Sequence, residues 1–254
     1  MNGSPRVGLF VTCLVDLVRP QVGFAAVKLL ENAGCTVEVP PTQTCCGQPA
    51  WNAGADAHTA DIARQVIDAF EPYDYVVVPS GSCAGMIKKH YPEALAGDAA
   101  YAPRARALAA KTYELTSFLV KVCGAPKLAA RCPAKAAYHD SCSSLREMGV
   151  KNEPRQLLQS VEGFALQELS DAQVCCGFGG LFSVKYPEIS ERMADDKLAD
   201  AEKAGAELLV GGDLGCLLHL AGRAERQGKS LRVRHVAEVL ADMGDTPALG
   251  EPAP

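Results

Sequence analysis

The sequence contains the stretch Cys45-Cys46-Gly47 and repeats it, 130 residues later, as Cys175-Cys176-Gly177. A lone cysteine lies on either side of each stretch at similar spacing: Cys13 and Cys83 around the first, Cys142 and Cys216 around the second. The offsets between matching cysteines are 129, 130 and 133 residues. Offsets this long and this nearly constant indicate an internal duplication with a small insertion late in the second half.

The segments between these cysteines repeat as well. Pro20 begins an apolar helical pattern that Gly34 ends, and Pro154 begins another that Gly163 ends. A further helix and an apolar strand follow in both halves, over residues 61–70 and 75–79 and over residues 187–204 and 207–211. Because strands alternate with helices, we predict an α/β fold of two pseudo-symmetric repeats, each with a largely parallel sheet and flanking helices.

The same pattern suggests boundaries for the repeats. We place the first repeat at residues 1–124, a proline-containing linker at 125–135, the second repeat at 136–244 and a disordered, proline-rich tail at 245–254. A single helix over residues 104–122 is expected to close the first repeat, and a helix over residues 236–242 the second.

Each repeated cysteine follows a predicted strand and precedes a predicted helix. Ligands of parallel α/β sheets gather beyond the carboxyl ends of the strands, where helix N-termini also favour an anionic thiolate. The candidate ligands, for a metal or a cofactor, are the eight cysteines that recur in both halves: Cys13, Cys45, Cys46, Cys83, Cys142, Cys175, Cys176 and Cys216. The other three, Cys35, Cys123 and Cys132, have no counterpart, and we expect them to bind no metal.

Four thiolates per half suit an iron–sulfur cluster or a tetrahedral zinc ion. Zinc sites usually contain Cys-x-x-Cys knuckles, and neither half has one, so the pattern favours iron–sulfur over zinc. The plainer alternative is eight buried thiols that bind nothing, since free cysteine packs well as a small apolar residue.

Composition narrows the class of protein. The 254 residues include 25 Lys and Arg against 30 Asp and Glu, a formal net charge of −5, with 48% hydrophobic residues. This is a globular composition, and without a basic run we expect no nucleic-acid partner. No apolar run approaches the roughly 18 residues of a transmembrane segment, so none is expected. Eleven cysteines, an odd number, and no recognisable signal peptide suggest a reducing, cytoplasmic location.

The cysteine motifs also resemble those of a known family. The stretches that carry the resemblance are residues 12–16, 44–49, 79–86, 138–142, 175–180 and 216–219, so that it extends over nearly the whole chain. They are similar to the duplicated cysteine-rich CCG domain that occurs in heterodisulfide reductase, in the iron–sulfur subunits of glycolate oxidase and anaerobic glycerol-3-phosphate dehydrogenase, and in lactate-utilisation proteins, which they resemble most.

The resemblance implies an iron–sulfur electron-transfer component of a complex that oxidises L-lactate to pyruvate. It implies one cluster per repeat, of the 4Fe-4S type, and partner subunits of a lactate-utilisation complex. The chain would be an oxidoreductase subunit that does not, by itself, bind the organic substrate. Two alternatives stay open: a heterodisulfide-reductase-like subunit that acts on a disulfide, and a metal-stabilised assembly subunit without a redox role.

The chain departs from the family pattern at two positions. Where the family has Cys-x-x-Cys, this sequence has Ser80 and Asp213 in place of the first thiol. We expect these two side chains to lie within hydrogen-bond reach of the clusters and to make the two sites differ in potential. His139 and His219 are weaker candidates as ligands, with bonding to backbone as the plainer role, and Arg146 could offset cluster charge.

Overall fold

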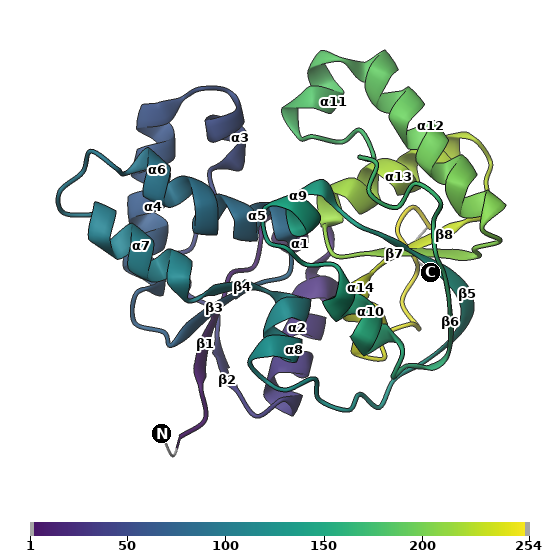
Figure 1. Cartoon of the computed structure of the whole chain (residues 1–254), viewed down its shortest axis with the longest axis horizontal. Helices are drawn as coiled ribbons and strands as arrows, with labels where there is room; N and C mark the ends of the chain where they lie inside the picture. The colour runs from purple at the N-terminus through teal and green to yellow at the C-terminus, as the bar shows by residue number, and fades with distance from the viewer. Residues whose placement is uncertain (1–2, 252–254) are drawn as a thin grey trace.

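The two halves of the chain form two parallel sheets with the same strand order, which confirms the predicted α/β duplication. The computed structural model describes residues 3–251. The first sheet has the order β2-β1-β3-β4 and the second β6-β5-β7-β8. The strands are β1 (Arg6–Leu9), β2 (Thr36–Glu38), β3 (Tyr75–Val78), β4 (Thr112–Glu114), β5 (Arg131–His139), β6 (Glu162–Gln167), β7 (Leu208–Gly211) and β8 (Arg232–His235). Figure 1 shows the first half in purple to teal and the second in green to yellow.

Helices connect the strands and cover both faces of each sheet. In the first half they are α1 (Cys13–Val18), α2 (Pro20–Asn32), α3 (Gln48–Asn52), α4 (Asp56–Phe70), α5 (Gly81–Gly85), the π-helix η1 (Met86–His90), α6 (Tyr91–Ala94), α7 (Ala102–Ala110) and α8 (Leu115–Lys121). In the second half they are α9 (Cys142–Arg146), α10 (Asn152–Leu158), α11 (Leu181–Lys185), α12 (Pro187–Lys203), α13 (Leu214–Arg226) and α14 (Val236–Leu240). The central strands β3 and β7 are almost entirely apolar and buried, as strands covered on both faces must be.

The single helix predicted over residues 104–122 is wrong. Helix α7 ends at Ala110, residues Thr112–Glu114 form β4 beside β3, and α8 begins at Leu115. The Thr112 side chain is buried and donates to the carbonyl of Leu108, which helps end the helix. A strand of three residues is too short to show an alternating pattern, so no local signal marked it.

The boundaries of the second half also differ from those predicted. Strand β5 begins at Arg131, inside the expected linker, and pairs with β6 from that residue on. The segment after α14 packs on the second sheet: the Leu249 amide donates to the carbonyl of Val233, and Ala248 is buried. The expected disorder is therefore wrong for residues 246–251, and residues 252–254 lie outside the described residues.

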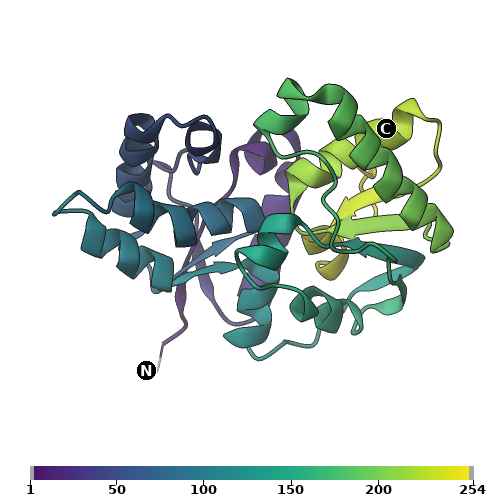
Figure 2. The same ribbon diagram turned by 45° about the horizontal axis from the view of Figure 1, so that its top comes forward.

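One apolar core runs through both halves, because the helices between the sheets pack on one another. Helix α2 packs on α14 and α8 on α10, and nearer the cysteines α5 packs on α9 and α1 on α13 (Figures 1 and 2). Helices α1, α2, α5 and α8 of the first half correspond to α9, α10, α13 and α14 of the second. The contact of α2 with α14 is therefore repeated as the contact of α10 with α8, and that of α1 with α13 as that of α9 with α5, as an internal twofold axis requires. The largely buried Arg19 guanidinium, 2.7 Å from Glu238, adds an ion pair across this interface.

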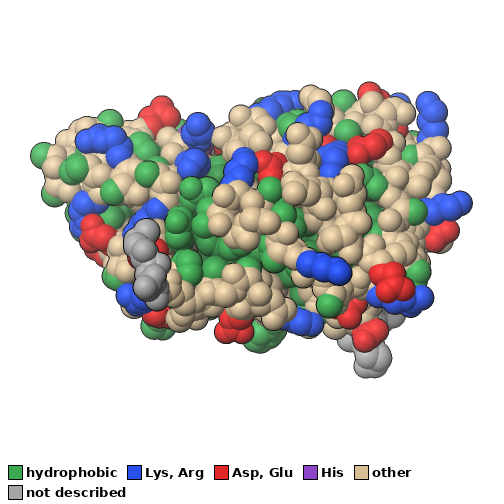
Figure 3. All heavy atoms as spheres, turned by 60° about the horizontal axis from the view of Figure 1, so that its bottom comes forward, with side chains coloured by type: hydrophobic (Ala, Val, Ile, Leu, Met, Phe, Trp, Pro, Cys, Tyr) green, Lys and Arg blue, Asp and Glu red, His purple; other side chains and the backbone are tan. Residues whose placement is uncertain are grey.

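The surface carries charges of both signs. On the face drawn in Figure 3, basic and acidic side chains are interspersed, with apolar side chains in the depression between them. Among residues 3–251, no helix combines the length and the apolar composition that a bilayer crossing requires.

Candidate metal centres

The first cysteine of each half lies at the first residue of a short helix. Cys13 begins α1 and Cys142 begins α9. The residue before each caps the helix: the Thr12 hydroxyl accepts from the Val15 amide, and the Ser141 hydroxyl accepts from the Ser144 amide. These caps fix the start of both helices just beyond the carboxyl ends of β1 and β5, and so place both thiols at the predicted edge of the sheet.

The last cysteine of each half is the third residue of a helix. Cys83 lies in α5 and Cys216 in α13, after β3 and β7, and both thiols are buried. The N-cap positions of these two helices are Ser80 and Asp213, the residues that replace the family's extra thiol. Neither side chain caps its own helix.

The two Cys-Cys-Gly stretches turn sharply at their glycines. Gly47 and Gly177 have φ of 83° and 89°, in the left-handed region that other residues adopt only with strain. A Cβ atom on Gly177 would also lie 2.6 Å from the carbonyl oxygen of Ser190. Glycine is therefore required there, and its turn lets two adjacent cysteines reach the same site.

The structure brings the eight predicted cysteines together as two sets of four. In the first set the Cys13 and Cys45 sulfurs are 4.0 Å apart, Cys45 also interacts with Cys46, and Cys46 with Cys83. In the second set the same chain of contacts runs through Cys142, Cys175, Cys176 and Cys216. We call these the first and the second thiol set.

The two sets have the same pattern of exposure at three of their four positions and differ at the first, Cys13 and Cys142. Cys46, Cys83, Cys176 and Cys216 are buried, Cys45, Cys142 and Cys175 are partly exposed, and Cys13 is exposed. Hydrogen bonds from neighbouring thiols, foremost Cys13 and Cys142, and from the amides of Gly47 and Gly177 hold the pKa of Cys45 and of Cys175 well below its usual range. Each set thus favours a thiolate, the form that binds metals.

Each thiol set borders a cavity that both halves line. A cavity of about 190 Å³ beside the first set is lined by Cys13, Cys46 and Cys83, and also by Phe178 and Gly180 of the second half. A cavity of about 220 Å³ beside the second set is lined by Cys142 and Cys216, and by Gln48, Asn52 and Ser82 of the first half. Asp213 lines both cavities, so the two sites adjoin each other across the interface.

Asp213 and Ser80 contact each other across that interface. The Asp213 carboxylate accepts from the Ser80 hydroxyl at 3.2 Å and from the Ser82 amide, in the first turn of α5, at 3.0 Å. Asp213 thereby caps a helix of the other half, where an anion interacts favourably with the amide dipoles. Sequence reasoning missed this contact because spacing along the chain does not report how the two halves pack.

The weaker candidates separate into one side chain that faces a thiol set and two that support a loop. His139, at the end of β5, lies beside Cys176 and Cys216, and burial lowers its pKa to about 4, so that its ring is neutral. His219 Nε2 is 3.2 Å from the hydroxyl of Ser190, which donates to the carbonyl of Gly177.

Arg146 donates to the carbonyl of Gln173, just before the second Cys-Cys-Gly stretch, at 3.4 Å. Arg146 therefore supports the loop that leads into Cys175.

Lys197 on α12 was missed by sequence reasoning; it is buried and lies near Cys176 and His139. A charged residue on an amphipathic helix is usually solvated, which is why nothing in the sequence marked it.

The three cysteines without counterparts join neither set. Cys35 and Cys123 lie beside each other, and burial raises the pKa of each. Cys132 is on β5, where Arg232, Arg234 and Asp242 are its charged neighbours. All eleven cysteines are free thiols in the part of the chain that the structure describes.

The residues present fit a metal or an iron–sulfur cluster. Each half offers four thiols joined by successive contacts, and four is the number of thiolates that either kind of centre uses. Both ring nitrogens of the buried His139 also lack a hydrogen-bond partner, which is the state of a side chain poised to bind an ion.

Comparison with known proteins gives a consistent result. The CCG cysteine-rich domain family matches this chain twice, over residues 7–88 and 136–221. Lactate utilization protein A of Geobacillus kaustophilus is 51% identical over 235 residues, which cover 92% of this chain and 98% of that protein. The protein of the same name from Halalkalibacterium halodurans is 47% identical over 92% of this chain and 96% of its own length.

One solved structure has a similar fold. The crystal structure of a hypothetical protein from Helicobacter pylori superposes with a TM-score of 0.68 at 10% sequence identity. The match covers 96% of this chain and 50% of that one, so this chain spans about half of that protein's length.

Proposed function

The chain belongs to the CCG cysteine-rich domain family, and on this premise we propose that it is the iron–sulfur electron-transfer component of a complex that oxidises L-lactate to pyruvate. The name that its relatives share, Lactate utilization protein A, supports the lactate pathway. The observation that carries the redox role is the pair of equivalent thiol sets, each at the carboxyl edge of a parallel sheet.

Each thiol set would hold one cluster of the 4Fe-4S type, on Cys13, Cys45, Cys46 and Cys83 in the first half and on Cys142, Cys175, Cys176 and Cys216 in the second. When bound, such clusters accept and release single electrons. Conversion of the lactate alcohol to the ketone of pyruvate breaks one C–H and one O–H bond and releases two electrons and two protons. Two one-electron sites in one chain match the two electrons.

The residues between the thiol sets favour transfer from one site to the other. The two cavities share Gln48, Ser82, Phe178, Gly180 and Asp213 as lining residues. The rate of electron transfer falls steeply with distance, so a single shared layer of side chains supports rapid exchange. The hydrogen bonds of Asp213 to Ser80 and Ser82 hold this layer in one arrangement.

The surface beside the thiol sets supports a role for partner subunits. A surface cavity of about 390 Å³ adjoins the first set and is lined by Cys13, Cys45, Leu17 and Val39. Leu17 is 79% exposed, and Val184 on α11, which directly follows Gly180, is 76% exposed. Exposed apolar groups near a site are typical of protein contacts. In this proposal a partner subunit handles lactate, and this chain receives the electrons.

Anaerobic purification of the full chain tests the proposal. We expect iron and acid-labile sulfide in similar amounts, with an EPR signal that a reductant changes, and reduction by lactate only when the partner subunits are present. Stoichiometric zinc without iron would overturn the redox role and favour the assembly subunit. Turnover of a disulfide by the isolated chain would identify the heterodisulfide-reductase-like alternative instead.

A further inference from the structure

The second thiol set has a histidine where the first has a phenylalanine. Cys13 matches Cys142 at an offset of 129 residues, and the same offset matches His139 to Phe10. His139 is the last residue of β5 and Phe10 directly follows β1, and the two side chains are buried, with 1% and 0% of their surface exposed. Phe10 belongs to the apolar cluster that also contains Cys46 and Cys83, so in both halves this position lies in the core that borders the thiols.

The His139 ring has no partner within the protein. Both of its nitrogens are buried without a hydrogen bond, and it is the only histidine of residues 3–251 in this condition. A neutral imidazole carries one N–H donor and one lone pair, and leaving both unpaired in an apolar site is costly. The other buried histidine, His235, uses its Nδ1 to accept from the Ala237 amide. The His139 ring is therefore held for a partner that the protein itself does not supply.

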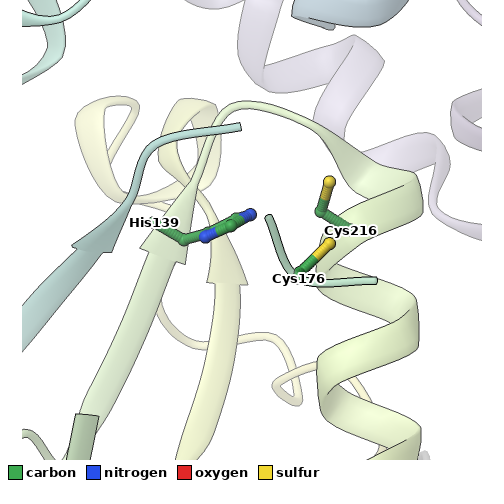
Figure 4. Close-up of side chains that lie close together, drawn as sticks. All are labelled: His139, Cys176 and Cys216. Atoms are coloured by element: carbon green, nitrogen blue, oxygen red, sulfur yellow. The ribbon is translucent and has the colours of Figure 1, made fainter. Parts of the chain in front are cut away.

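The ring points at two of the thiols. One ligand atom each from His139, Cys176 and Cys216 lie within 4.8 Å of one another, and all three residues are buried. Figure 4 shows the imidazole directed toward both sulfurs from the opposite side of the site. A metal with bonds of about 2.0–2.1 Å to nitrogen and about 2.3 Å to sulfur holds such atoms roughly 3.5 Å apart, so only small shifts would close the site.

The charges around the second set also suit a ligand that adds no charge. Helix α12, which packs beside this set, buries Lys197 near the thiols and Asp200 under the loop at residues 170–171, whereas the corresponding helix α4 buries no charged side chain. Asp213, which lines the cavity of the second set, already adds a carboxylate beside Cys142 and Cys216. A neutral imidazole completes a metal's ligand set without adding to this negative charge, and imidazole binds iron and zinc well.

We propose that His139 is a nitrogen ligand of the metal centre in the second half, so that this centre has mixed thiolate and imidazole ligation while the first has thiolates alone. The inference rests on the proposed metal sites and revises one ligand of the second: with four ligand positions, His139 takes the place of Cys142, the partly exposed thiol at the end of the set. It assigns Cys176 and Cys216 as the thiolates adjacent to the imidazole, and it makes the two centres chemically different in spite of the duplicated fold.

Nitrogen labelling of the anaerobically reconstituted chain tests the ligand directly. Pulsed EPR of the reduced protein should show a nitrogen coupling that differs between unlabelled protein and protein labelled with ¹⁵N-histidine. The coupling should vanish in His139→Phe and in His139→Cys, which keeps a metal ligand, and persist in the matched control Phe10→Leu. Absence of the coupling in the wild type, or its persistence in His139→Phe, would overturn the proposal. Phenylalanine already occupies this position in the first half, so His139→Phe should fold.

Cobalt binding separates this inference from the proposed function. We expect His139→Phe to bind Co²⁺ at one of two sites at least about tenfold more weakly, with shifted visible bands, and Phe10→Leu to leave both sites unchanged. If the chain holds no iron but the cobalt bands depend on His139, the redox role fails and the ligand stands. If iron is present and neither readout depends on His139, the ligand fails and the redox role stands.

Discussion

The two halves share a fold and a set of thiols but differ in what surrounds the thiols. Around the first set lie Phe10, Val11 and the apolar face of α4; around the second lie His139, Asp140 and an α12 that buries Lys197. The helix starts, the two glycine turns and the cysteine sulfurs are alike in both halves, because the geometry that brings four thiols together constrains them. The divergent positions set charge and hydrogen bonding, so one fold can supply two sites of different electrostatic character.

The largest expected effect is loss of one centre while the other remains. We expect Cys45→Ser to remove the metal of the first half and Cys175→Ser that of the second, because each residue contacts two other thiols of its own set. Metal per chain, measured anaerobically, should fall by about half in either variant. If one substitution empties both sites, the halves do not bind independently and the comparison between them breaks down.

The next largest effect concerns an ion pair that only the second half contains. The Asp140 side chain is 1% exposed and Arg155 is 12% exposed, with two N–O contacts of 2.9 and 2.8 Å. We expect Asp140→Ala to lower the free energy of unfolding by about 2–3 kcal/mol, since it removes the buried partner of the guanidinium and leaves the more exposed Glu168, at 2.8 and 3.0 Å, as its remaining carboxylate. Urea unfolding measures this.

The first half supplies the control for that pair. Val11 takes the place of Asp140 there, and Val11→Ala should cost only about 1 kcal/mol because the site is partly exposed. Replacing both charged residues, with Asp140→Val and Arg155→Leu, should recover much of the lost stability. Equal losses for Asp140→Ala and Val11→Ala would show that the ion pair contributes nothing specific to the second half.

The residues that cap α8 and α14 should give the halves opposite pH dependence. Burial lowers the pKa of His235 to about 4 and raises the pKa of Glu114 above its ordinary value. Between pH 6.5 and about 4 the unfolded chain protonates His235 and the folded chain does not. The free energy of unfolding therefore decreases as the pH is lowered through this range, by up to about 3 kcal/mol. Glu114 acts in the other direction, because the folded chain favours its neutral carboxyl. Its contribution to the free energy of unfolding is complete below pH 4.5 and is lost as the pH rises through its raised pKa.

Two variants separate these contributions. The stability of His235→Asn minus that of the wild type should increase as pH falls from 6.5 to 4, because the substitution removes the acid penalty and keeps a capping residue. The same difference for Glu114→Gln should increase as pH rises above 4.5. Urea unfolding of metal-free protein over this range measures both, and parallel curves for wild type and variants would contradict the assignment.

The smallest effect is expected for the cysteines outside both sets. Replacing Cys35, Cys123 and Cys132 together with alanine should leave the metal content unchanged and lower the free energy of unfolding by about 1 kcal/mol, mainly through the buried Cys35. Iron and sulfide analysis of the triple variant checks this. A loss of metal would mean that a third group of ligands exists and that the two-site comparison is incomplete.

The repeated spacing of the cysteines predicted both sheets and the grouping of the thiols, because strand, helix and turn residues occur in the same order in each half. It did not predict β4 or β8, which are short edge strands in which polar and charged residues interrupt the apolar run that indicates the equally short β3 and β7. The boundary at β5 was misplaced for a related reason: Pro133 lies within this strand, and proline ordinarily indicates a turn.

The sequence by itself determined the duplicated α/β architecture and which cysteines belong to each half, since both follow from local periodicity and spacing along the chain. Only the tertiary structure decided that Asp213 caps a helix of the other half, that both halves line each cavity and that His139 faces Cys176 and Cys216. These contacts depend on how the two sheets pack across their shared helices. Packing joins residues far apart in sequence, and no local pattern records which of them meet.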